Sequence, residues 1–292
     1  MPELPEVEVV RSGLEPAATG ATITRVEVLD ERSLRRHDGP SEDFAERLTG
    51  AVLARPERRG KFLWVPIAGR DEALVVHLGM SGQVLLRAPD APRDRLTRIV
   101  LDLDAPGHGP VRVDFVDQRI FGSMAVDALV PASDHPEQRI PSQVTHIARD
   151  TVDPLFDDAA FLRRLARKNT GIKRALLDQT LISGVGNIYA DESLWAARIH
   201  PEQPTATLSR ARAKTLLAEV RLVLGRALVE GGTSFDATYV NVNGASGYFA
   251  HSLNAYGRHG TPCPRCGRPI VREEFMNRGS HYCRFCQRIR VR

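Results

Sequence analysis

The chain contains no apolar run of the roughly 18 to 20 residues that a membrane-spanning helix needs. We expect no secretory leader, because the first residues, MPELPEVE, are acidic where a leader would be basic and then apolar. Internal repeats and low-complexity tracts are absent, and 42% hydrophobic with 26% charged residues is typical of a globular chain. We therefore expect a cytoplasmic protein whose 292 residues form one large or two medium domains.

Lysine is scarce. Among 40 basic residues the only lysines are Lys61, Lys168, Lys173 and Lys214. A chain this rich in arginine would keep lysine where a compact, titratable ammonium is needed. Lys61, which follows Arg58-Arg59-Gly60 at the head of an expected strand, is the strongest candidate for such a role. An ordinary surface lysine is the alternative.

The positive charge is concentrated at one end of the chain. Residues 258–292 hold nine arginines and two glutamates, a net charge of +7, whereas the whole chain carries +4 and the remainder therefore −3. A concentrated positive field suits a polyanion such as nucleic acid. The alternative is a solvated basic tail.

Cysteine occurs only near the C-terminus, at Cys263, Cys266, Cys283 and Cys286. Two C-x2-C pairs in a cytosolic chain predict a tetrahedral zinc site, because each tight turn presents two sulfurs to one metal. Two disulfides are the alternative, which a reducing compartment disfavours. Four thiolates close the coordination sphere, so we expect one structural zinc ion.

Between the cysteine pairs, two short strands are predicted over Pro269–Phe275 and Ser280–Phe285. Asn277-Arg278-Gly279 is the expected turn between them. This basic module is therefore expected to be a zinc-bound hairpin with Arg278 at its tip.

The rest of the chain divides into a strand-rich and a helical part. Residues 1–135 predict an N-terminal helix beginning near Pro5, followed by a β-sandwich or barrel. The expected strands are Ile23–Leu29, Phe62–Ile67, Leu74–Leu78, Val84–Leu86, Ile99–Leu103 and Val111–Val116. Proline-rich residues 136–156 predict a linker, and residues 157–257 show helical periodicity, ending in a long helix that stops at Gly231-Gly232.

Two features of the helical part favour phosphate binding. Lys168, Lys173 and Arg174 flank one helix start, and Gly184-Val185-Gly186-Asn187 forms a tight turn that opens the next helix. A helix N-terminus offers backbone N–H groups and a positive dipole, which suit a phosphate. An ordinary turn is the alternative, since Gly-x-Gly-Asn alone is weakly specific.

The N-terminus carries unusual chemistry. Pro2 follows the initiator Met1, a context in which Met1 is expected to be removed to leave a secondary amine. With an α-amino pKa near about 8, roughly a tenth of this amine would be nucleophilic at pH 7. Its iminium with a sugar carbon is cationic without a proton, which favours elimination, and Glu3 and Glu6 are adjacent carboxyls. Alternatively, Pro2 only leads into the helix and the acids complement its dipole.

A series of segments in one order along the chain resembles the formamidopyrimidine-DNA glycosylase family. They are Pro2-Glu3-Leu4-Pro5-Glu6-Val7-Glu8, Arg59-Gly60-Lys61-Phe62-Leu63, His77-Leu78-Gly79-Met80-Ser81-Gly82, Asp117-Gln118-Arg119-Ile120-Phe121-Gly122, the run from Gly184 to Ala190, Gly247-Tyr248-Phe249, and the four-cysteine finger. The resemblance implies a bacterial base-excision repair enzyme that removes oxidised purines from duplex DNA. It also implies lyase cleavage by β,δ-elimination through a Schiff base on the N-terminal proline.

The resemblance further implies an α+β fold in which a β-sandwich joins a helix-two-turns-helix domain and a zinc finger. The implied partner is double-stranded DNA with 8-oxoguanine, formamidopyrimidine or abasic lesions. We expect it to be bound by a monomer at the bacterial nucleoid.

Residue roles follow from the same resemblance. The nucleophile falls on Pro2, the general acid on Glu3 and the supporting carboxylate on Glu6. The lyase-associated lysine falls on Lys61, and the finger arginine, with a part in catalysis and DNA binding, on Arg278. The other implied DNA-binding residues are His77, Met80, Arg119, Phe121, Lys168 and Asn187. Of these, Met80, Arg119 and Phe121 would fill the space left by a flipped nucleotide, although strand-core positions are the alternative for the two apolar side chains.

Two departures from the family pattern bear on lesion preference. Family members often have a second arginine where this chain has Ile120, and many have a lysine in the loop before Gly247, where residues 241–246 contain none. The related endonuclease VIII branch, a non-catalytic zinc-containing DNA-binding regulator and an inactive lesion-binding paralogue are alternatives. Leu4 and the Arg119-Ile120-Phe121 segment argue against the first, and the presence of Pro2, Glu3 and Lys61 argues against the others.

Overall fold

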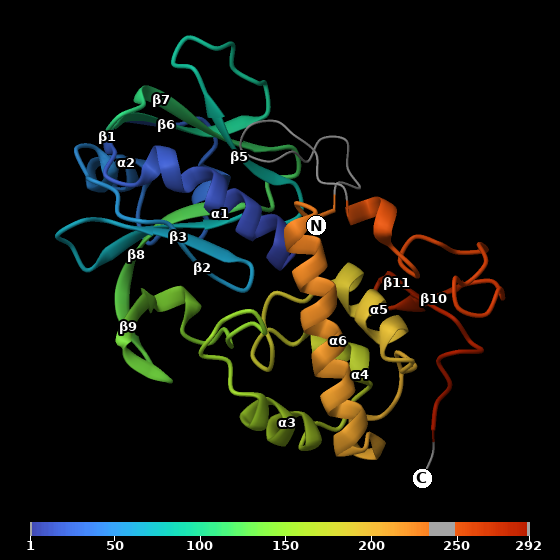
Figure 1. The fold of residues 1–292 in the computed structure, drawn as a ribbon. Helices are drawn as coiled ribbons and strands as arrows, with labels where there is room; N and C mark the ends of the chain where they lie inside the picture. Colours follow the sequence, from blue (N-terminus) through green and yellow to red (C-terminus); the bar gives the residue numbers. More distant parts are fainter. Residues whose placement is uncertain (1, 234–248, 291–292) are drawn as a thin grey trace. The chain divides into compact units, whose positions relative to one another are not determined.

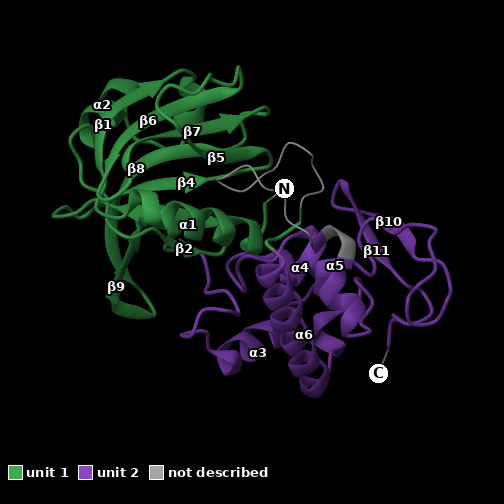
Figure 2. Ribbon diagram, turned by 45° about the horizontal axis from the view of Figure 1, so that its top comes forward, with its two compact units in different colours: residues 1–146, 231–247 green, residues 147–230, 248–292 purple. Residues whose placement is uncertain are grey.

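The computed structural model describes residues 2–233 and 249–290. The chain forms two compact units (Figures 1 and 2), which we call the sandwich unit, residues 1–146 with 231–247, and the helical unit, residues 147–230 with 248–292. Within the described residues no helix is long and apolar enough to cross a membrane. The predictions made for the loop at residues 241–248 fall outside the described residues.

The sandwich unit contains two antiparallel sheets. One has the order β1-β6-β7-β5 and the other β2-β3-β4-β8-β9. The strands are β1 (Thr22–Val28), β2 (Glu57–Arg59), β3 (Phe62–Pro66), β4 (Glu72–His77), β5 (Gly82–Arg87), β6 (Thr97–Ala105), β7 (Gly109–Asp117), β8 (Ser123–Ala132) and β9 (His135–Pro141). Side chains such as Val65 and Leu74 of one sheet share a single core with Leu101 and Phe115 of the other. The expected β-sandwich is therefore confirmed.

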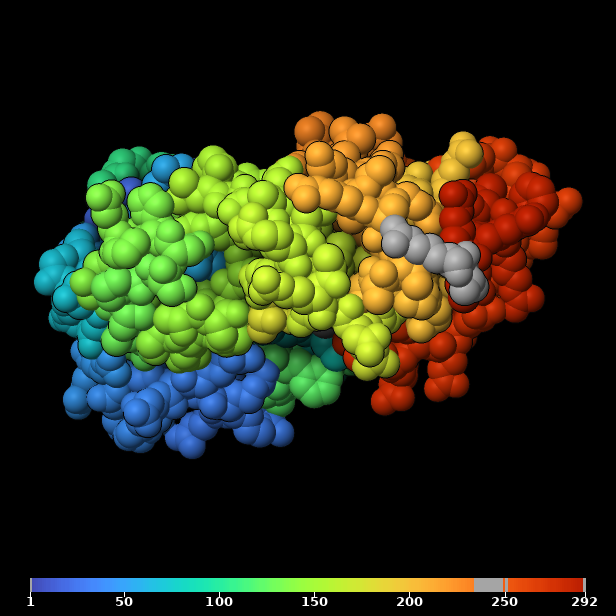
Figure 3. Space-filling view, turned by 90° about the horizontal axis from the view of Figure 1, so that it is seen from below, coloured from blue at the N-terminus to red at the C-terminus, as the bar shows by residue number. Residues whose placement is uncertain are grey.

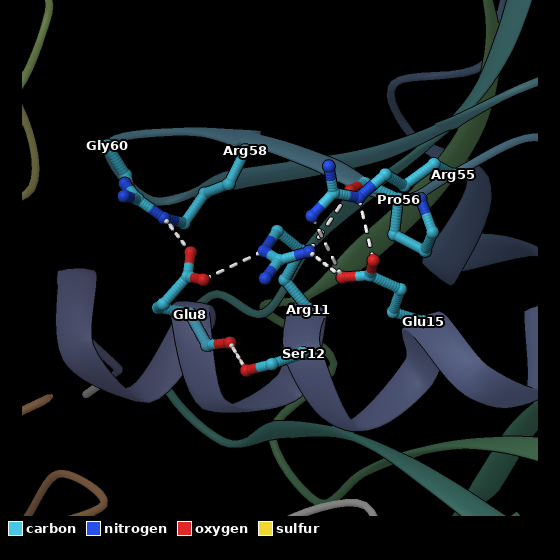
Figure 4. Close-up of polar contacts among 8 residues, drawn as sticks. All are labelled: Glu8, Arg11, Ser12, Glu15, Arg55, Pro56, Arg58 and Gly60. Carbon is cyan, nitrogen blue, oxygen red and sulfur yellow. Dashed lines mark hydrogen bonds and ion pairs between the residues drawn. The ribbon is translucent and has the colours of Figure 1, made fainter. Parts of the chain in front are cut away.

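Helix α1 (Leu4–Ala18) begins at the expected place and buries Val7, Val10 and Leu14 in that core. Ion pairs attach its other face to the β2 segment (Figure 4). Glu8 contacts both Arg11 and Arg58 at 2.8 Å, and Glu15 contacts Arg55 at 2.7 Å. These pairs connect the middle and the end of α1 to the segment around β2. Helix α2 (Ser41–Leu48) and the 3-10 turns η1 (Glu31–Leu34) and η2 (Ser142–Val144) complete this unit.

The helical unit comprises α3 (Asp158–Ala166), α4 (Ile172–Leu177), α5 (Asn187–Ala196), α6 (Arg210–Val229), η3 (Thr205–Thr207), η4 (Phe249–Ser252) and the hairpin β10 (Val271–Phe275) and β11 (Arg278–Tyr282). Ser209 caps α6 by accepting the Arg212 N–H, and Leu216, Val220 and Leu224 form its buried stripe. The finger residues, red in Figure 3, lie against orange residues of the same unit.

Several details differ from the sequence-based expectations, and the strands β2 and β8 are not among the six that were expected. Residues 136–141 of the expected linker belong to β9, which pairs with β8. The hairpin turn is Met276-Asn277, with φ of 47° and 59°, so Arg278 is the first residue of β11 and lies one position past the tip. This β11 ends at Tyr282, three residues before the expected end at Phe285.

Candidate active site and nucleic-acid interface

The predicted catalytic residues at the N-terminus are buried and held by hydrogen bonds. Pro2 is buried, and Glu3 and Glu6 are 1% and 3% exposed. The Glu3 N–H donates to Glu6 Oε2 at 2.8 Å, and Glu6 Oε1 accepts from the Thr233 N–H at 2.8 Å and its hydroxyl at 2.9 Å. Glu6 is therefore used on both oxygens to fix backbone, a supporting role that differs from proton transfer.

Gly232 is required beside this carboxylate. It has φ of +79°, and a Cβ placed on it would lie 2.9 Å from Glu6 Oε1. The chain thus returns after α6 to close on α1, a long-range contact that no local sequence pattern could indicate.

Lys61 lies in the two-residue turn between β2 and β3, after Gly60 with φ of 59°. Glycine at the first central position is typical of a type II′ hairpin turn. Lys61 is close enough to His77 to affect that imidazole. Burial, with Arg36 and Lys61 nearby, lowers the pKa of His77 to about 4.

His77 is consequently neutral at pH 7. Its Nδ1 accepts the Gly79 N–H at 3.2 Å, which leaves the ring proton on Nε2 as a donor. Its ring lies 4.7 Å from that of Phe62, over which Arg36 stacks at 5.3 Å. The sandwich unit therefore carries a group of cationic and N–H donor side chains suited to an anion.

Met80, Arg119 and Phe121 occupy two loops at the ends of strands. Met80 is 39% and Phe121 48% exposed, which contradicts the strand-core alternative for both. Arg119 is exposed as well, and its guanidinium has no hydrogen-bond or ion-pair partner among the described residues. We call residues 118–122 the wedge loop.

A buried aspartate joins these two loops. Asp117 accepts from the Ser81 hydroxyl at 2.5 Å, the Arg119 N–H at 3.1 Å and the Gly122 N–H at 2.6 Å. A Cβ on Gly79 would lie 2.3 Å from the backbone of Phe121, so the two loops touch through their main chains. The three side chains are thus presented together on one fixed support.

In the helical unit, Asn187 is the first residue of α5 and is 7% exposed. Its Nδ2 donates to Gly279 O at 3.0 Å, which ties it to the finger hairpin, while its Oδ1 has no partner in the described residues. Gln179 braces the preceding turn by accepting the Gly184 N–H at 2.9 Å and donating to Val185 O at 2.9 Å.

Lys168 contacts Asp178 at 2.6 Å and lines an open hollow of about 410 Å³. Arg174 and Met276 of the hairpin turn line the same hollow. Asp178 lines this hollow too, and the DNA-backbone contact of Lys168 stays a prediction.

A buried ion pair that sequence reasoning missed lies beneath this surface. Lys173 Nζ contacts Asp191 Oδ1 at 2.7 Å, and both side chains are 0% exposed. Asp191 Oδ2 also accepts the His281 N–H at 2.8 Å, and Lys173 lies 4.7 Å from the centre of the Phe275 ring. The pair therefore fastens both strands of the hairpin to α4 and α5.

The four cysteine sulfurs lie within 4.8 Å of one another, and none forms a disulfide. Burial raises the pKa of the Cys263 thiol, but hydrogen bonds, first from the Trp195 indole, lower it to about 7. Burial and the neighbouring sulfurs raise the pKa of Cys286 to about 12. Crowded thiolates of this kind need a cation, and a four-sulfur tetrahedral set suits Zn²⁺.

The finger is docked on the end of α5. Trp195 Nε1 donates to Cys263 Sγ at 3.4 Å, and Arg265 stacks on the Trp195 ring at 4.1 Å while donating to Trp195 O at 3.0 Å. Arg278 is exposed, and its guanidinium has no partner among the described residues. The C-x2-C spacing indicated the metal ligands, whereas nothing local indicated Trp195, Asp117 or Asp191.

Comparisons with known proteins agree with this arrangement. Residues 1–124 match the formamidopyrimidine-DNA glycosylase N-terminal domain, residues 147–238 the formamidopyrimidine-DNA glycosylase H2TH domain, and residues 260–289 a zinc finger found in FPG and IleRS. Formamidopyrimidine-DNA glycosylase of Leifsonia xyli subsp. xyli is 64% identical, covering 99% of this chain and 100% of the relative. That of Thermobifida fusca is 55% identical, covering 98% and 97%.

Solved structures of Lactococcus lactis Fpg are similar along the whole chain. The wild-type complex with N7-benzyl-Fapy-dG containing DNA has a TM-score of 0.83 and 32% identity, covering 98% of this chain and 99% of that one. The complex with abasic-site DNA has a TM-score of 0.83 and 31% identity, with the same coverage.

Proposed function

The chain belongs to the formamidopyrimidine-DNA glycosylase family, and from that premise we propose that it excises oxidised purines from duplex DNA and cleaves the resulting abasic strand. The substrates are 8-oxoguanine and formamidopyrimidines. The observation that carries the proposal is the buried Pro2-Glu3 start of α1, held by a Glu6 carboxylate whose two oxygens bind backbone N–H groups. The Glu6–Glu3 contact is also part of the capping box of α1, whereas the hydrogen bonds from Thr233 to Glu6 Oε1 tie the start of the chain to a distant segment.

The reaction follows from these groups. After loss of Met1, the Pro2 nitrogen attacks the sugar C1′, and the glycosidic bond breaks with its electron pair leaving on the base. Glu3 supplies the proton that the leaving group requires, which contributes about 10²- to 10⁴-fold. The amine loses its proton, and its lone pair then expels O4′, which takes up a proton as the C1′–O4′ bond breaks and an iminium forms between Pro2 and C1′. The iminium accepts the electrons when a C2′ proton is lost and the 3′ phosphate leaves by β-elimination. Loss of a further sugar proton then releases the 5′ phosphate by δ-elimination.

The remaining residues hold the DNA. Lys61, His77, Lys168, Asn187 and Arg278 contact phosphates, and Lys61 and Arg278 also assist the lyase step. Met80, Arg119 and Phe121 enter the duplex where the lesion leaves it. Extruding a nucleotide costs a few kcal/mol, and stacking on Phe121 returns about 1 to 3 kcal/mol.

The finger completes the protein with one structural Zn²⁺ held by Cys263, Cys266, Cys283 and Cys286. Four sulfurs leave no open coordination position, so the metal supplies folding energy to residues 258–292 and takes no part in catalysis. One chain provides every proposed contact, and we propose that it acts as a monomer on nucleoid DNA.

Borohydride trapping tests the proposal. The protein is incubated with a duplex containing one 8-oxoguanine opposite cytosine, with and without borohydride. We expect a covalent adduct on Pro2 that Pro2→Gly largely abolishes. Glu3→Gln should lose excision by roughly 10²- to 10⁴-fold while retaining more activity on an abasic site, where the base is already gone.

Glu8→Gln is the matched control, because Glu8 is on the same helix and pairs with Arg11 and Arg58 instead. It should excise normally. An adduct that maps to Lys61 with Pro2 unmodified would overturn the nucleophile assignment.

A further inference from the structure

Arg35, the residue after η1, binds the wedge loop from outside. Its guanidinium donates to the carbonyl oxygens of three successive residues: to Ile120 O at 2.9 Å, to Phe121 O by a shorter contact, and to Gly122 O at 3.0 Å. No motif of the sequence singles out this arginine, and no role in the reaction has been assigned to it above.

The wedge loop has a conformation that needs such support. Ile120 has φ of 55°, in the left-handed region, which is a genuine outlier for a β-branched residue. Strained backbone of this kind persists only where its surroundings over-determine it. The Asp117 carboxylate binds N–H groups at the two ends of the loop, while Arg35 binds the carbonyls in its middle and at its end.

We propose that Arg35 is a positioning residue, which sets the direction in which Phe121 and Arg119 enter the duplex by holding the wedge loop through its carbonyl groups. The inference rests on the proposed function, because the wedge matters only where a nucleotide is flipped. A planar guanidinium with five donors in a fixed fork can bind three adjacent carbonyls at once. A lysine ammonium at this position keeps the charge but cannot reproduce that fork.

Arg35 is exposed, so the alternative role is a direct contact with a DNA phosphate. Substitution by lysine distinguishes a phosphate contact from support of the wedge loop. A phosphate contact tolerates Arg35→Lys, since lysine binds phosphate as a point charge. An arginine that holds the wedge loop through three carbonyl groups would not tolerate this substitution, because lysine lacks the guanidinium fork. Arg32 provides the matched control, because it lies in η1 and pairs only locally with Asp30 at 2.7 Å.

The experiment compares Arg35→Lys, Arg35→Ala and Arg32→Lys with the unsubstituted protein. Single-turnover excision of 8-oxoguanine opposite cytosine should fall by about tenfold to a hundredfold in both Arg35 variants, the range expected for a small misplacement of a positioning group. Cleavage of a single-stranded abasic oligonucleotide should not change. Arg32→Lys should match the unsubstituted protein on both substrates.

A double-mutant cycle tests whether Arg35 acts through the wedge. In a Phe121→Ala background, Arg35→Lys should add little further loss, because residues that act as one unit are not additive. Full activity of Arg35→Lys on the duplex, or equal losses on duplex and single strand, would overturn the inference.

Amide hydrogen exchange provides a measurement that does not depend on activity. The Arg119 and Gly122 N–H groups should exchange faster in Arg35→Ala than in the unsubstituted protein, while the β7 amides stay protected. Unchanged amide exchange in the wedge loop would refute the proposed role of Arg35, even if the enzyme is active. If the unsubstituted protein shows no excision while the loop amides still respond to Arg35→Ala, the proposed function fails, but the contact of Arg35 with the wedge loop is supported.

Discussion

Arg119 of the sandwich unit and Arg278 of the helical unit are both exposed and without a side-chain partner among the described residues, but they are supported by different means. Arg119 is on a loop whose N–H groups donate to Asp117 and whose carbonyl groups accept from Arg35. In the helical unit, Arg278 is on a hairpin held by a fully buried ion pair and a four-cysteine cluster. The first support can loosen locally, whereas the second combines a buried ion pair with the proposed zinc site, so its failure should release the whole hairpin.

Loss of a metal ligand should have the largest effect. Cys283 is 1% exposed, and Cys283→Ser should release zinc and unfold the hairpin, because small metal modules take their folding energy from the metal. We expect zinc release in a chelator assay and a sharp drop in duplex binding, while the sandwich unit remains folded by circular dichroism. Tight duplex binding by zinc-free protein would contradict this expectation.

Breaking the buried ion pair should come next. Asp191→Ala removes the carboxylate that faces the buried Lys173 ammonium, at a cost of about 3 to 5 kcal/mol. Urea denaturation measures this loss. The control is Asp158→Ala, which removes an exposed pair with Arg221 in the same unit and should cost at most about 1 kcal/mol. Equal losses for the two variants would show that the buried pair is not the stronger support.

Removing each arginine should then separate discrimination from affinity. Arg119→Ala should fold normally and lose roughly tenfold or more in excision rate on 8-oxoguanine opposite cytosine, with a weaker preference for the opposite base.

Arg278→Ala should bind all duplexes more weakly and lower the slope of log affinity against log salt by about 0.9, equivalent to one phosphate. Excision rates and salt titrations distinguish the two. If Arg119→Ala loses a similar factor of activity on single-stranded abasic DNA, Arg119 contacts the DNA backbone and does not read the opposite base.

The last prediction concerns pH. Burial and nearby cations lower the pKa of His77 from 6.5 to about 4. Between these values the unfolded chain takes up a proton that the folded protein does not, so stability should decrease as pH falls through this window. His77→Gln should remove that part of the slope in urea titrations at pH 7, 5.5 and 4.5. An identical slope in both proteins would show that His77 titrates normally.

Local patterns were sufficient for much of the fold. The six expected strands and α6 follow runs of apolar residues bounded by turn signals, and the sandwich follows from them. The β2 strand was missed because its sequence, Glu57-Arg58-Arg59, is wholly charged. The β9 strand was missed because Pro136 and Pro141 indicated a linker, although proline is tolerated in the edge position that β9 occupies.

The site was predictable where chemistry depends on spacing, as at the cysteines and Pro2-Glu3. It was not predictable where a contact joins distant segments. In the sequence, Asp117 is only a polar residue at the end of a strand, and Asp191 is only one of the acidic residues in a helix. Only the fold brings Asp191 to Lys173 and His281, or Arg35 to the carbonyl groups around residue 120.

Because Trp195 contacts Cys263, intrinsic tryptophan fluorescence can report on the metal site of the finger. The chain has two tryptophans, Trp64 fully buried in β3 and Trp195 with its indole N–H 3.4 Å from a cysteine sulfur. Each unit therefore contains one tryptophan. In a Trp64→Phe background, the tryptophan emission that remains comes from Trp195 of α5, which contacts the finger through Cys263, and its change on chelation reports metal loss in real time. The sandwich unit is followed in the same way through Trp64 after Trp195→Phe.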